Sequence, residues 1–278
     1  MNSMQIKDKV RNIANKKNVD FNTVFRLYMY DRFIERLAVS EYKDNFILKG
    51  GFYLSTLFGV ENRATMDIDT AITKATFSES NIRKMLEEII SIDINDNAIL
   101  ELASISTIRD EDEYGGYRAT INIKLENIKE SFHIDIATGD PITPKAINYK
   151  YFPALGDKHI NLWAYNIETV LAEKLETILS KAEASSRTRD YYDIYLIYKM
   201  SIENINQDHF RKAVEKTFEK RKYEGDIINT LTKIKDSEIL KNRWESYSRK
   251  NSYAKDISYE DVIECLEALV KVIEPVTV

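Results

Sequence analysis

The chain has 278 residues and a formal net charge of −5 at pH 7, so it can form one large domain or two smaller ones and lacks an overall basic field. Its single cysteine, Cys265, excludes an internal disulfide. No stretch approaches the roughly 20 apolar residues of a membrane helix, and the N-terminus lacks the apolar core of a signal peptide. We therefore expect a cytoplasmic protein that does not enter a membrane.

The first quarter of the chain combines helical and strand patterns. Residues 6–43 repeat apolar residues at helical spacing, and the short apolar segment 46–48 follows. The sequence "GGFYLSTLF" predicts a helix that starts at Gly50 and ends at Gly59, where a C-terminal cap is expected. Residues 64–72, "ATMDIDTAI", alternate between apolar and polar positions, which predicts a half-buried strand.

Further strands follow before residue 141. Residues 78–92 predict a helix with a serine cap. Two strands, 99–107 and 116–126, flank "DEDEYGG", whose Asp and Gly residues favour a hairpin turn. The segment 130–141, "ESFHIDIATGDP", alternates again and predicts another strand.

The second half is helical in pattern. Three of the four prolines fall in 141–153, which indicates a loop region near a domain boundary. Helices are predicted at 166–183, about 188–200, 207–222, 225–248 and 258–273. We therefore expect an α+β protein with a small mixed sheet flanked by helices in residues 1–160 and a helical domain in residues 161–278.

Three carboxylates lie on the polar faces of predicted strands. Asp67 and Asp69 are two residues apart, so their side chains project to the same side, and Asp135 lies on a later strand. Mg²⁺ prefers oxygen ligands and is usually held by one or two carboxylates together with substrate phosphates. A solvated strand face is the simpler alternative for the Asp-x-Asp pair alone.

Two adjacent glycines precede the predicted helix. The N-terminus of a helix presents backbone N–H groups and a positive dipole end to a phosphate, and glycine permits close approach. Gly50 and Gly51 fit this role, and Ser55 adds a hydroxyl one turn later. A glycine pair alone is usually only a turn. The order of glycine pair, acidic strand and later acidic strand favours a nucleotide and metal site.

A second group of charged residues begins in the helical half. Lys174 flanks an apolar helix stripe, where it can extend to solvent or neutralise a triphosphate. Asp190 and Asp193 lie in the first turn of the next predicted helix. Either acid can favour the helix dipole or act as the base that activates a hydroxyl, and Asp193 is slightly preferred as the base.

A basic stripe offers a nucleic-acid contact despite the negative net charge. Phosphate contacts from such a stripe position an RNA without reading its sequence. Acidic residues interrupt the stripe, so a solvated helix is the alternative. The stripe consists of Arg211, Lys212, Lys216 and Lys220.

The motifs "LKGG", "MDIDT" and "FHIDIATGD" resemble those of the nucleotidyltransferase superfamily, which has the polymerase-beta-like fold. Together with "NIETVLAEKLETILSKAEASSRTRDYYDIYLI", they make residues 45–200 similar to the AbiEii/AbiGii toxin family. The resemblance implies an N-terminal nucleotidyltransferase domain and a helical C-terminal half. One departure is that Gly51 stands where the superfamily often has serine.

The resemblance also implies roles for matching residues. The glycines and the lysine would bind the triphosphate, the first three aspartates would hold metal, and one of the last two would be catalytic. The matching positions are Gly50, Gly51, Asp67, Asp69, Asp135, Lys174, Asp190 and Asp193.

The function implied by this resemblance is that of a bacterial toxin from a toxin–antitoxin or abortive-infection phage-defence system. With Mg²⁺ or Mn²⁺ it would transfer NMP from an NTP, possible substrates being GTP or a pyrimidine NTP, to an RNA acceptor. The expected acceptor is the 3′ end of tRNA, and its modification would block translation. A cognate antitoxin encoded nearby would neutralise the toxin, with direct binding left open. The alternatives are a protein or small-molecule hydroxyl as acceptor, or a non-catalytic NTP-binding module.

Overall fold

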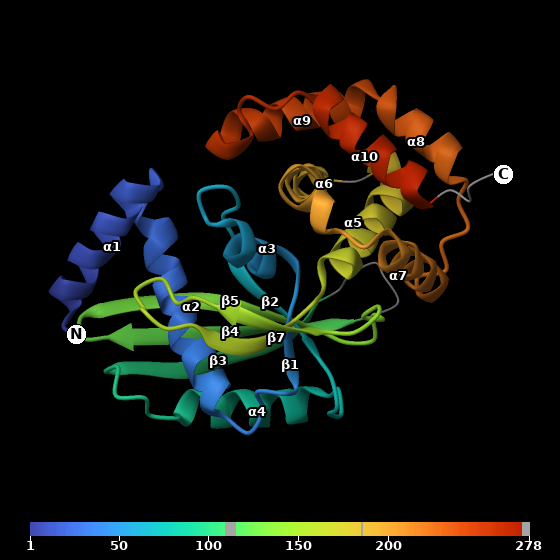
Figure 1. The fold of residues 1–278 in the computed structure, drawn as a ribbon. Helices are drawn as coiled ribbons and strands as arrows, with labels where there is room; N and C mark the ends of the chain where they lie inside the picture. Colours follow the sequence, from blue (N-terminus) through green and yellow to red (C-terminus); the bar gives the residue numbers. More distant parts are fainter. Residues whose placement is uncertain (109–114, 185, 274–278) are drawn as a thin grey trace. The chain divides into compact units, whose positions relative to one another are not determined.

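The computed structural model describes residues 1–108, 115–184 and 186–273 (Figure 1). The chain divides into two compact units. The first contains Met1–Gly139 and Ile147–Ala164, and the second contains Asp140–Ala146 and Tyr165–Val278. None of the helices in these described stretches has the length and apolar character needed to cross a membrane.

The first unit contains a seven-stranded sheet with the order β3-β4-β5-β2-β1-β7-β6. The pairs β1–β7 and β2–β5 are parallel and the other neighbours are antiparallel, so the expected mixed sheet is confirmed. The strands are β1 Phe46–Leu48, β2 Asp67–Ile72, β3 Ala98–Ile108, β4 Gly116–Leu125, β5 Ile128–Ala137, β6 Ile147–Tyr151 and β7 Ile160–Ala164. The predicted hairpin turn between β3 and β4 lies mostly outside the described residues.

Strands β6 and β7 fall where the sequence predicted loop or boundary. Each has five residues and pairs with the other, and β7 also pairs with β1. Strands this short next to prolines carry little periodic signal. Their pairing partners, rather than their own pattern, determine that they are strands.

Among the described residues of the first unit, helices α1 to α4 accompany the sheet, and α2 has more buried side chains than any of the other three. The ring of Tyr30 on α2 makes edge contacts with Phe52 on α3 and Phe132 on β5, so these aromatic residues join helices to sheet. The helices are α1 Ser3–Lys17, α2 Phe21–Val39, α3 Gly50–Phe58 and α4 Glu79–Ser91.

A buried carboxylate ties α2 to the β6 region. Asp31 accepts hydrogen bonds from the Tyr151 hydroxyl at 2.5 Å and from the Ala154 backbone N–H at 2.7 Å. Burial raises the pKa of Asp31 to about 7, although these two hydrogen bonds and the charge of Arg32 lower it in part. The first unit therefore contains a carboxyl group that titrates near neutral pH.

The second unit is helical. Its helices are α5 Ile167–Lys181, α6 Thr188–Ser201, α7 Gln207–Lys220, α8 Ile227–Lys235, α9 Glu238–Lys250 and α10 Tyr259–Ile273. The prediction of one helix over 225–248 was wrong, because α8 ends at Lys235 and α9 begins at Glu238, with Asp236 and Ser237 as the capping residues between them. The Ser237 hydroxyl accepts a hydrogen bond from the Leu240 N–H and donates one to Glu183 at 2.5 Å. This cap starts a new helix inside a continuous apolar pattern.

The segment Asp140–Ala146 belongs to the helical unit although its chain neighbours belong to the sheet unit. The Thr143 N–H donates to the Thr169 hydroxyl at 3.0 Å, and that hydroxyl donates back to the Thr143 carbonyl at 3.1 Å. The Asn166 side-chain amide donates to the Lys145 carbonyl at 2.9 Å. The change of unit falls after Ala164, and the division into domains at residue 160 stays a prediction.

Candidate functional site

The glycine pair brings the start of α3 against strand β2. Gly50 has a φ of +56°, and a Cβ at this position would lie 2.8 Å from the Asp69 Cγ. The Asp69 carboxylate accepts a hydrogen bond from the Phe52 backbone N–H at 3.0 Å, and the Lys49 N–H donates to the Asp69 carbonyl at 3.1 Å. Glycine is required here by both its backbone conformation and the close contact. One N–H of the helix start is therefore already bonded to the acidic strand.

Gly51 faces a buried arginine that sequence reasoning missed. A Cβ on Gly51 would lie 2.6 Å from Nη2 of Arg63. Arg63 is buried, with 2% of its surface exposed. An arginine in a loop before the acidic strand carries no periodic signal, so its contact with the glycine was not predictable. The glycine pair thus provides space for a carboxylate on one side and a guanidinium on the other.

Ser55 lies inside the first unit. Its side chain is fully buried, and its hydroxyl has no hydrogen-bond partner among the described residues. A hydroxyl in this position does not face solvent. Its assignment to nucleotide binding stays a prediction.

The structure places the three aspartates of the first unit on one face of neighbouring strands. In the parallel pair β2–β5, Asp69 is the register partner of Asp135, and Asp67 is the partner of His133. The intervening Ile68 is fully buried, so the alternation of β2 is real and the aspartates lie on the opposite face. Parallel strands lie about 4.8 Å apart, which brings these acids together.

Arg118 on β4 completes this acidic group and was absent from the predicted site. Its Nε donates to Asp135 Oδ1 and its Nη2 to Asp135 Oδ2, both at 2.7 Å. The same Nη2 lies 3.6 Å from Asp67 Oδ2. Hydrogen bonding to Asp135 and the charges of the three aspartates raise the pKa of Arg118, against a lowering by burial. Alternation along β4 places Arg118 on the polar face, but only the register with β5 shows its partner.

Carboxylate oxygens from neighbouring strands are the donor chemistry that Mg²⁺ or Mn²⁺ requires, so the residues fit such an ion in type. As they lie here, no three His, Cys, Asp or Glu side chains within the described part of the chain converge on a common metal position. Both Asp135 oxygens accept hydrogen bonds from Arg118, and one Asp69 oxygen accepts from Phe52. The site thus has the oxygen donors of a metal centre, but several of these oxygens accept hydrogen bonds from other groups of the protein.

The charged residues predicted in the helical half also come together. Lys174 Nζ on α5 lies 2.7 Å from Asp190 Oδ1 and 2.7 Å from Asp193 Oδ2, both on α6. The Lys174 side chain is 11% exposed, so it does not extend to solvent as a lysine beside an apolar stripe usually does. Burial lowers the pKa of Lys174, but the two carboxylates outweigh it and raise the pKa to about 12. The amine therefore stays protonated at neutral pH.

The two candidate bases differ in exposure. The Asp193 side chain is fully buried, whereas that of Asp190 is 16% exposed. Asp190 lies in the first turn of α6, where an acid also favours the helix dipole, and Asp193 lies beyond that turn. Both carboxylates also bind the lysine, and which of them is catalytic stays a prediction.

The predicted basic stripe on α7 is only partly available to a ligand. Arg211 donates from Nε to the Val272 carbonyl at 2.7 Å and from Nη1 to Asp208 at 3.0 Å, which ties it to the end of α10. Lys212 and Lys216 are exposed, and Lys220 is half-buried. The next residue, Arg221, belongs to the interior of the unit, where it binds Glu176 at 2.8 Å and Asp140 at 3.2 Å.

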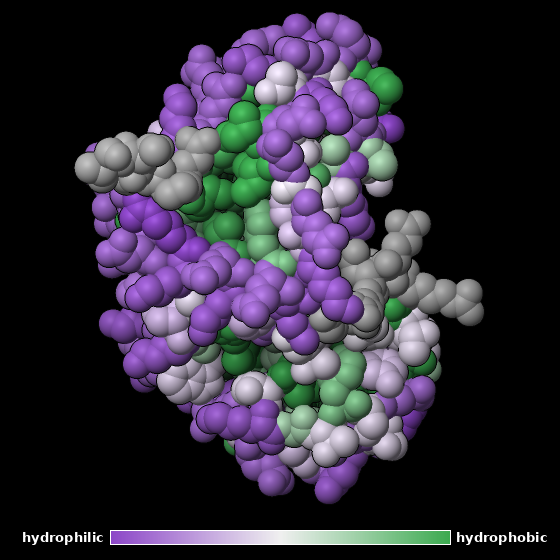
Figure 2. Space-filling model, turned by 90° about the vertical axis from the view of Figure 1, so that its right-hand side faces the viewer, coloured by the Kyte–Doolittle hydropathy of each residue, from purple (hydrophilic) through white to green (hydrophobic). Residues whose placement is uncertain are grey.

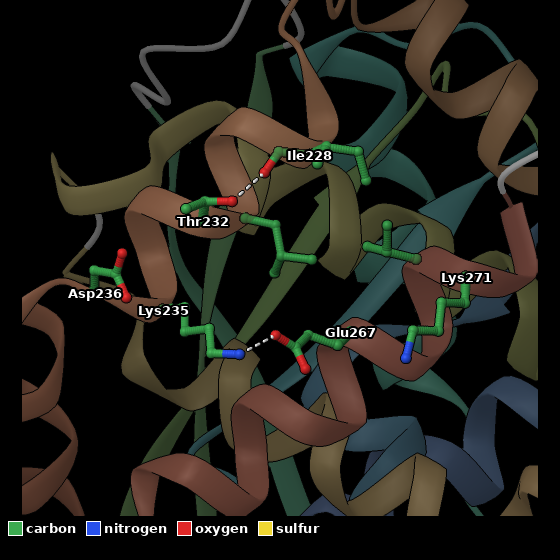
Figure 3. Close-up of a pocket in the computed structure, with 8 residues that line it drawn as sticks. Ile228, Thr232, Lys235, Asp236, Glu267 and Lys271 are labelled. Atoms are coloured by element: carbon green, nitrogen blue, oxygen red, sulfur yellow. Dashed lines mark hydrogen bonds and ion pairs between the residues drawn. The ribbon is translucent and has the colours of Figure 1, made fainter.

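A pocket of about 480 Å³ lies between α8 and α10 (Figure 3). On the face drawn in Figure 2, apolar side chains gather in a hollow of the helical unit. An ion pair of 2.7 Å between Lys235 and Glu267 crosses the pocket. None of the predicted nucleotide- or metal-binding residues lines it. The lining residues are Ile228, Leu231, Thr232, Lys235, Asp236, Glu267, Val270 and Lys271.

Solved structures of other proteins have a similar fold. The fold is similar to that of MenT4, the nucleotidyltransferase toxin Rv2826c from Mycobacterium tuberculosis H37Rv, with a TM-score of 0.58 and 14% identity over 96% of this chain and 99% of that one. It is also similar to JHP933 from Helicobacter pylori, with a TM-score of 0.52 and 17% identity over 91% of each chain. Among curated proteins the comparison found no match.

At these identities the likenesses show a shared fold, and the family follows from the sequence. The family model described as "Nucleotidyl transferase AbiEii toxin, Type IV TA system" matches residues 32–267. The chain therefore belongs to the AbiEii family of nucleotidyltransferase toxins, and the resemblance found in its motifs is confirmed.

Proposed function

We propose that this AbiEii-family toxin transfers NMP from an NTP to the 3′ end of tRNA, with Mg²⁺ or Mn²⁺, and thereby blocks translation in phage defence in the bacterial cytoplasm. The observation that carries the proposal is the register match of Asp69 with Asp135, which gathers three carboxylates beside the start of α3. Such a group of acids costs free energy through mutual repulsion unless cations offset it. The family membership supports the nucleotidyltransferase class of reaction.

The proposed division of roles follows from the chemistry of each residue. Asp67, Asp69 and Asp135 would hold the divalent ion, which supplies positive charge that offsets the charge of the triphosphate. The backbone around Gly50 and Gly51 is proposed to receive a phosphate, because glycine leaves the N–H groups accessible to a ligand.

In the helical unit, the protonated Lys174 is proposed to neutralise phosphate charge. Either Asp190 or Asp193 accepts the proton of the acceptor hydroxyl. The acceptor oxygen then forms its bond to the α-phosphorus, the bond from that phosphorus to the bridging oxygen breaks, and pyrophosphate leaves. Both carboxylates lie 2.7 Å from the lysine, but the Asp190 side chain is 16% exposed whereas that of Asp193 is fully buried, so Asp190 has the better access to solvent. Asp190→Asn and Asp193→Asn, measured by kcat at equal protein stability, distinguish the two.

The partners follow from the same proposal. The exposed Lys212 and Lys216 are available to contact the RNA backbone. The family's place in a type IV toxin–antitoxin system implies an antitoxin that neutralises this toxin. Co-expression with the protein encoded beside the toxin gene, scored by growth, identifies that partner.

The test of the function is a transfer assay with purified protein, Mg²⁺ or Mn²⁺, total bacterial tRNA and each α-³²P-labelled NTP in turn. Asp67→Asn removes one proposed metal ligand, and Asp157→Asn is the matched control at an exposed position of the same unit. Label on tRNA that is lost in Asp67→Asn and kept in Asp157→Asn supports the proposal and identifies the nucleotide. Absence of label with every NTP from folded, growth-arresting protein would refute a tRNA acceptor and direct the search to other acceptors, protein or small-molecule hydroxyls among them.

A further inference from the structure

Arg118 holds the position of a cation in the acidic group. Its fork covers both oxygens of Asp135 at 2.7 Å, and one nitrogen of that fork, Nη2, also lies 3.6 Å from Asp67. A single positively charged group thus contacts two of the three carboxylates. Neither the sequence motifs nor the proposed mechanism requires an arginine at this place.

This arginine differs in its exposure from Arg36, which lies in the same unit and also donates two N–H groups to one carboxylate. The Arg118 side chain is 42% exposed, whereas Arg36, which binds Asp96, is 2% exposed. A buried guanidinium that loses its partner suffers a large desolvation cost, but a half-exposed one can turn into water with little loss. Arg118 can therefore form a defined ion pair with Asp135 and can also dissociate from it at low cost in free energy.

Arg118 and a divalent cation require the same oxygens. A guanidinium fork that donates to both oxygens of a carboxylate occupies the side from which a metal ion would bind both of these oxygens at once. An ion held between Asp135 and Asp67 would also repel the guanidinium at close range. The binding of Arg118 and the binding of a metal ion to Asp135 therefore oppose each other.

We propose that Arg118 competes with the divalent cation for Asp135 and Asp67. Without nucleotide, Arg118 occupies these carboxylates and opposes metal binding. When nucleotide binds, its phosphates bind the guanidinium that has left Asp135. The first half of this inference rests on the metal site of the proposed function, and the second half rests also on its nucleotide substrate, but neither half depends on the RNA acceptor. A planar fork that suits a carboxylate also suits a phosphate. Metal and nucleotide therefore strengthen each other's binding, because each favours the state in which Arg118 has left Asp135.

The competition is tested with Mn²⁺ alone, by electron paramagnetic resonance of the free ion during titration of the protein without nucleotide or RNA. Arg118→Gln removes the competing charge, and the expected result is Mn²⁺ binding about three- to tenfold tighter than wild type, the scale of one partly exposed charge-assisted ion pair. Arg83→Gln is the matched control, because Arg83 is 41% exposed and pairs with Glu79 at 3.2 Å in the same unit. It should leave Mn²⁺ binding unchanged.

Equal Mn²⁺ affinity in wild type and Arg118→Gln would overturn the inference, as would absence of Mn²⁺ binding in both. Arg118→Lys retains the charge but not the fork, so it should bind Mn²⁺ with intermediate affinity and carries the test if the glutamine variant does not fold. For the second half, calorimetry with α,β-methylene NTP analogues in saturating Mn²⁺ should show nucleotide binding weakened about tenfold in Arg118→Gln. Unchanged analogue affinity would refute the transfer of Arg118 to phosphate. Because the Mn²⁺ titration contains no acceptor, failure of tRNA labelling would refute the proposed function without affecting this result.

Discussion

The buried carboxyl group of Asp31 makes the stability of the sheet unit depend on pH near neutrality. Its pKa is raised from 3.8 to about 7 in the folded chain. Between these values the folded state holds a proton that the unfolded state has released, so protonation stabilises the fold and the free energy of unfolding falls as pH rises. From the two pKa values, this group alone should make the protein about 2.7 kcal/mol more stable at pH 5 than at pH 8.

Asp31→Asn isolates this contribution, because the amide has nearly the same shape and does not titrate. The assay is urea denaturation of both proteins at several pH values from 5 to 8, followed by circular dichroism. The wild type should gain about 2.7 kcal/mol relative to the variant as pH falls from 8 to 5. Asp157→Asn, at an exposed position, should follow the wild-type curve. A difference between wild type and Asp31→Asn that stays constant over this range would refute the assignment of a raised pKa to Asp31.

Three further predictions concern the candidate site. Gly50→Ala should destabilise the protein by about 1–3 kcal/mol in urea denaturation, because its φ of +56° and its contact with the acidic strand both oppose a Cβ; unchanged stability would contradict the close packing. Lys174→Met should lower the free energy of unfolding by about 3–5 kcal/mol, because it leaves two carboxylates of low exposure without their cation. Adding Asp193→Leu should recover part of this loss. Additive losses in this double-mutant cycle would argue against direct coupling. Gln at both Lys212 and Lys216 should weaken tRNA binding and lower the slope of log K against log salt by about 2, and a slope equal to that of wild type would exclude these lysines from the RNA contact.

The parts of the fold that were predictable are those whose pattern is local. Alternation along β2 and β5 is enough to place the three aspartates on polar faces, and the strands confirm it. By contrast, β6 and β7 are short and become strands through pairing with distant segments, which no local pattern reports. The single helix predicted over 225–248 was wrong because the Ser237 cap outweighs a continuous apolar periodicity.

The same distinction applies to the candidate site. The glycines, the aspartates and Lys174 lie in local motifs, and the sequence identified them. Arg118 lies in an ordinary strand sequence, and its role depends on the register between β4 and β5. Arg63 depends on a contact with Gly51. Residues that act through non-local contacts with a motif are therefore the ones that sequence reasoning missed.

The path of the chain between the two units has a consequence for how such a gene can change. The chain passes from one unit to the other after Gly139, after Ala146 and after Ala164, and Asp140–Ala146 is bonded into the helical unit through Thr169 and Arg221. No single break point separates two complete units. Recombination after Gly139 would separate β6 and β7 from the rest of the sheet, and recombination after Ala164 would separate Asp140–Ala146 from the helical unit. The two units are therefore expected to be inherited together rather than exchanged as modules.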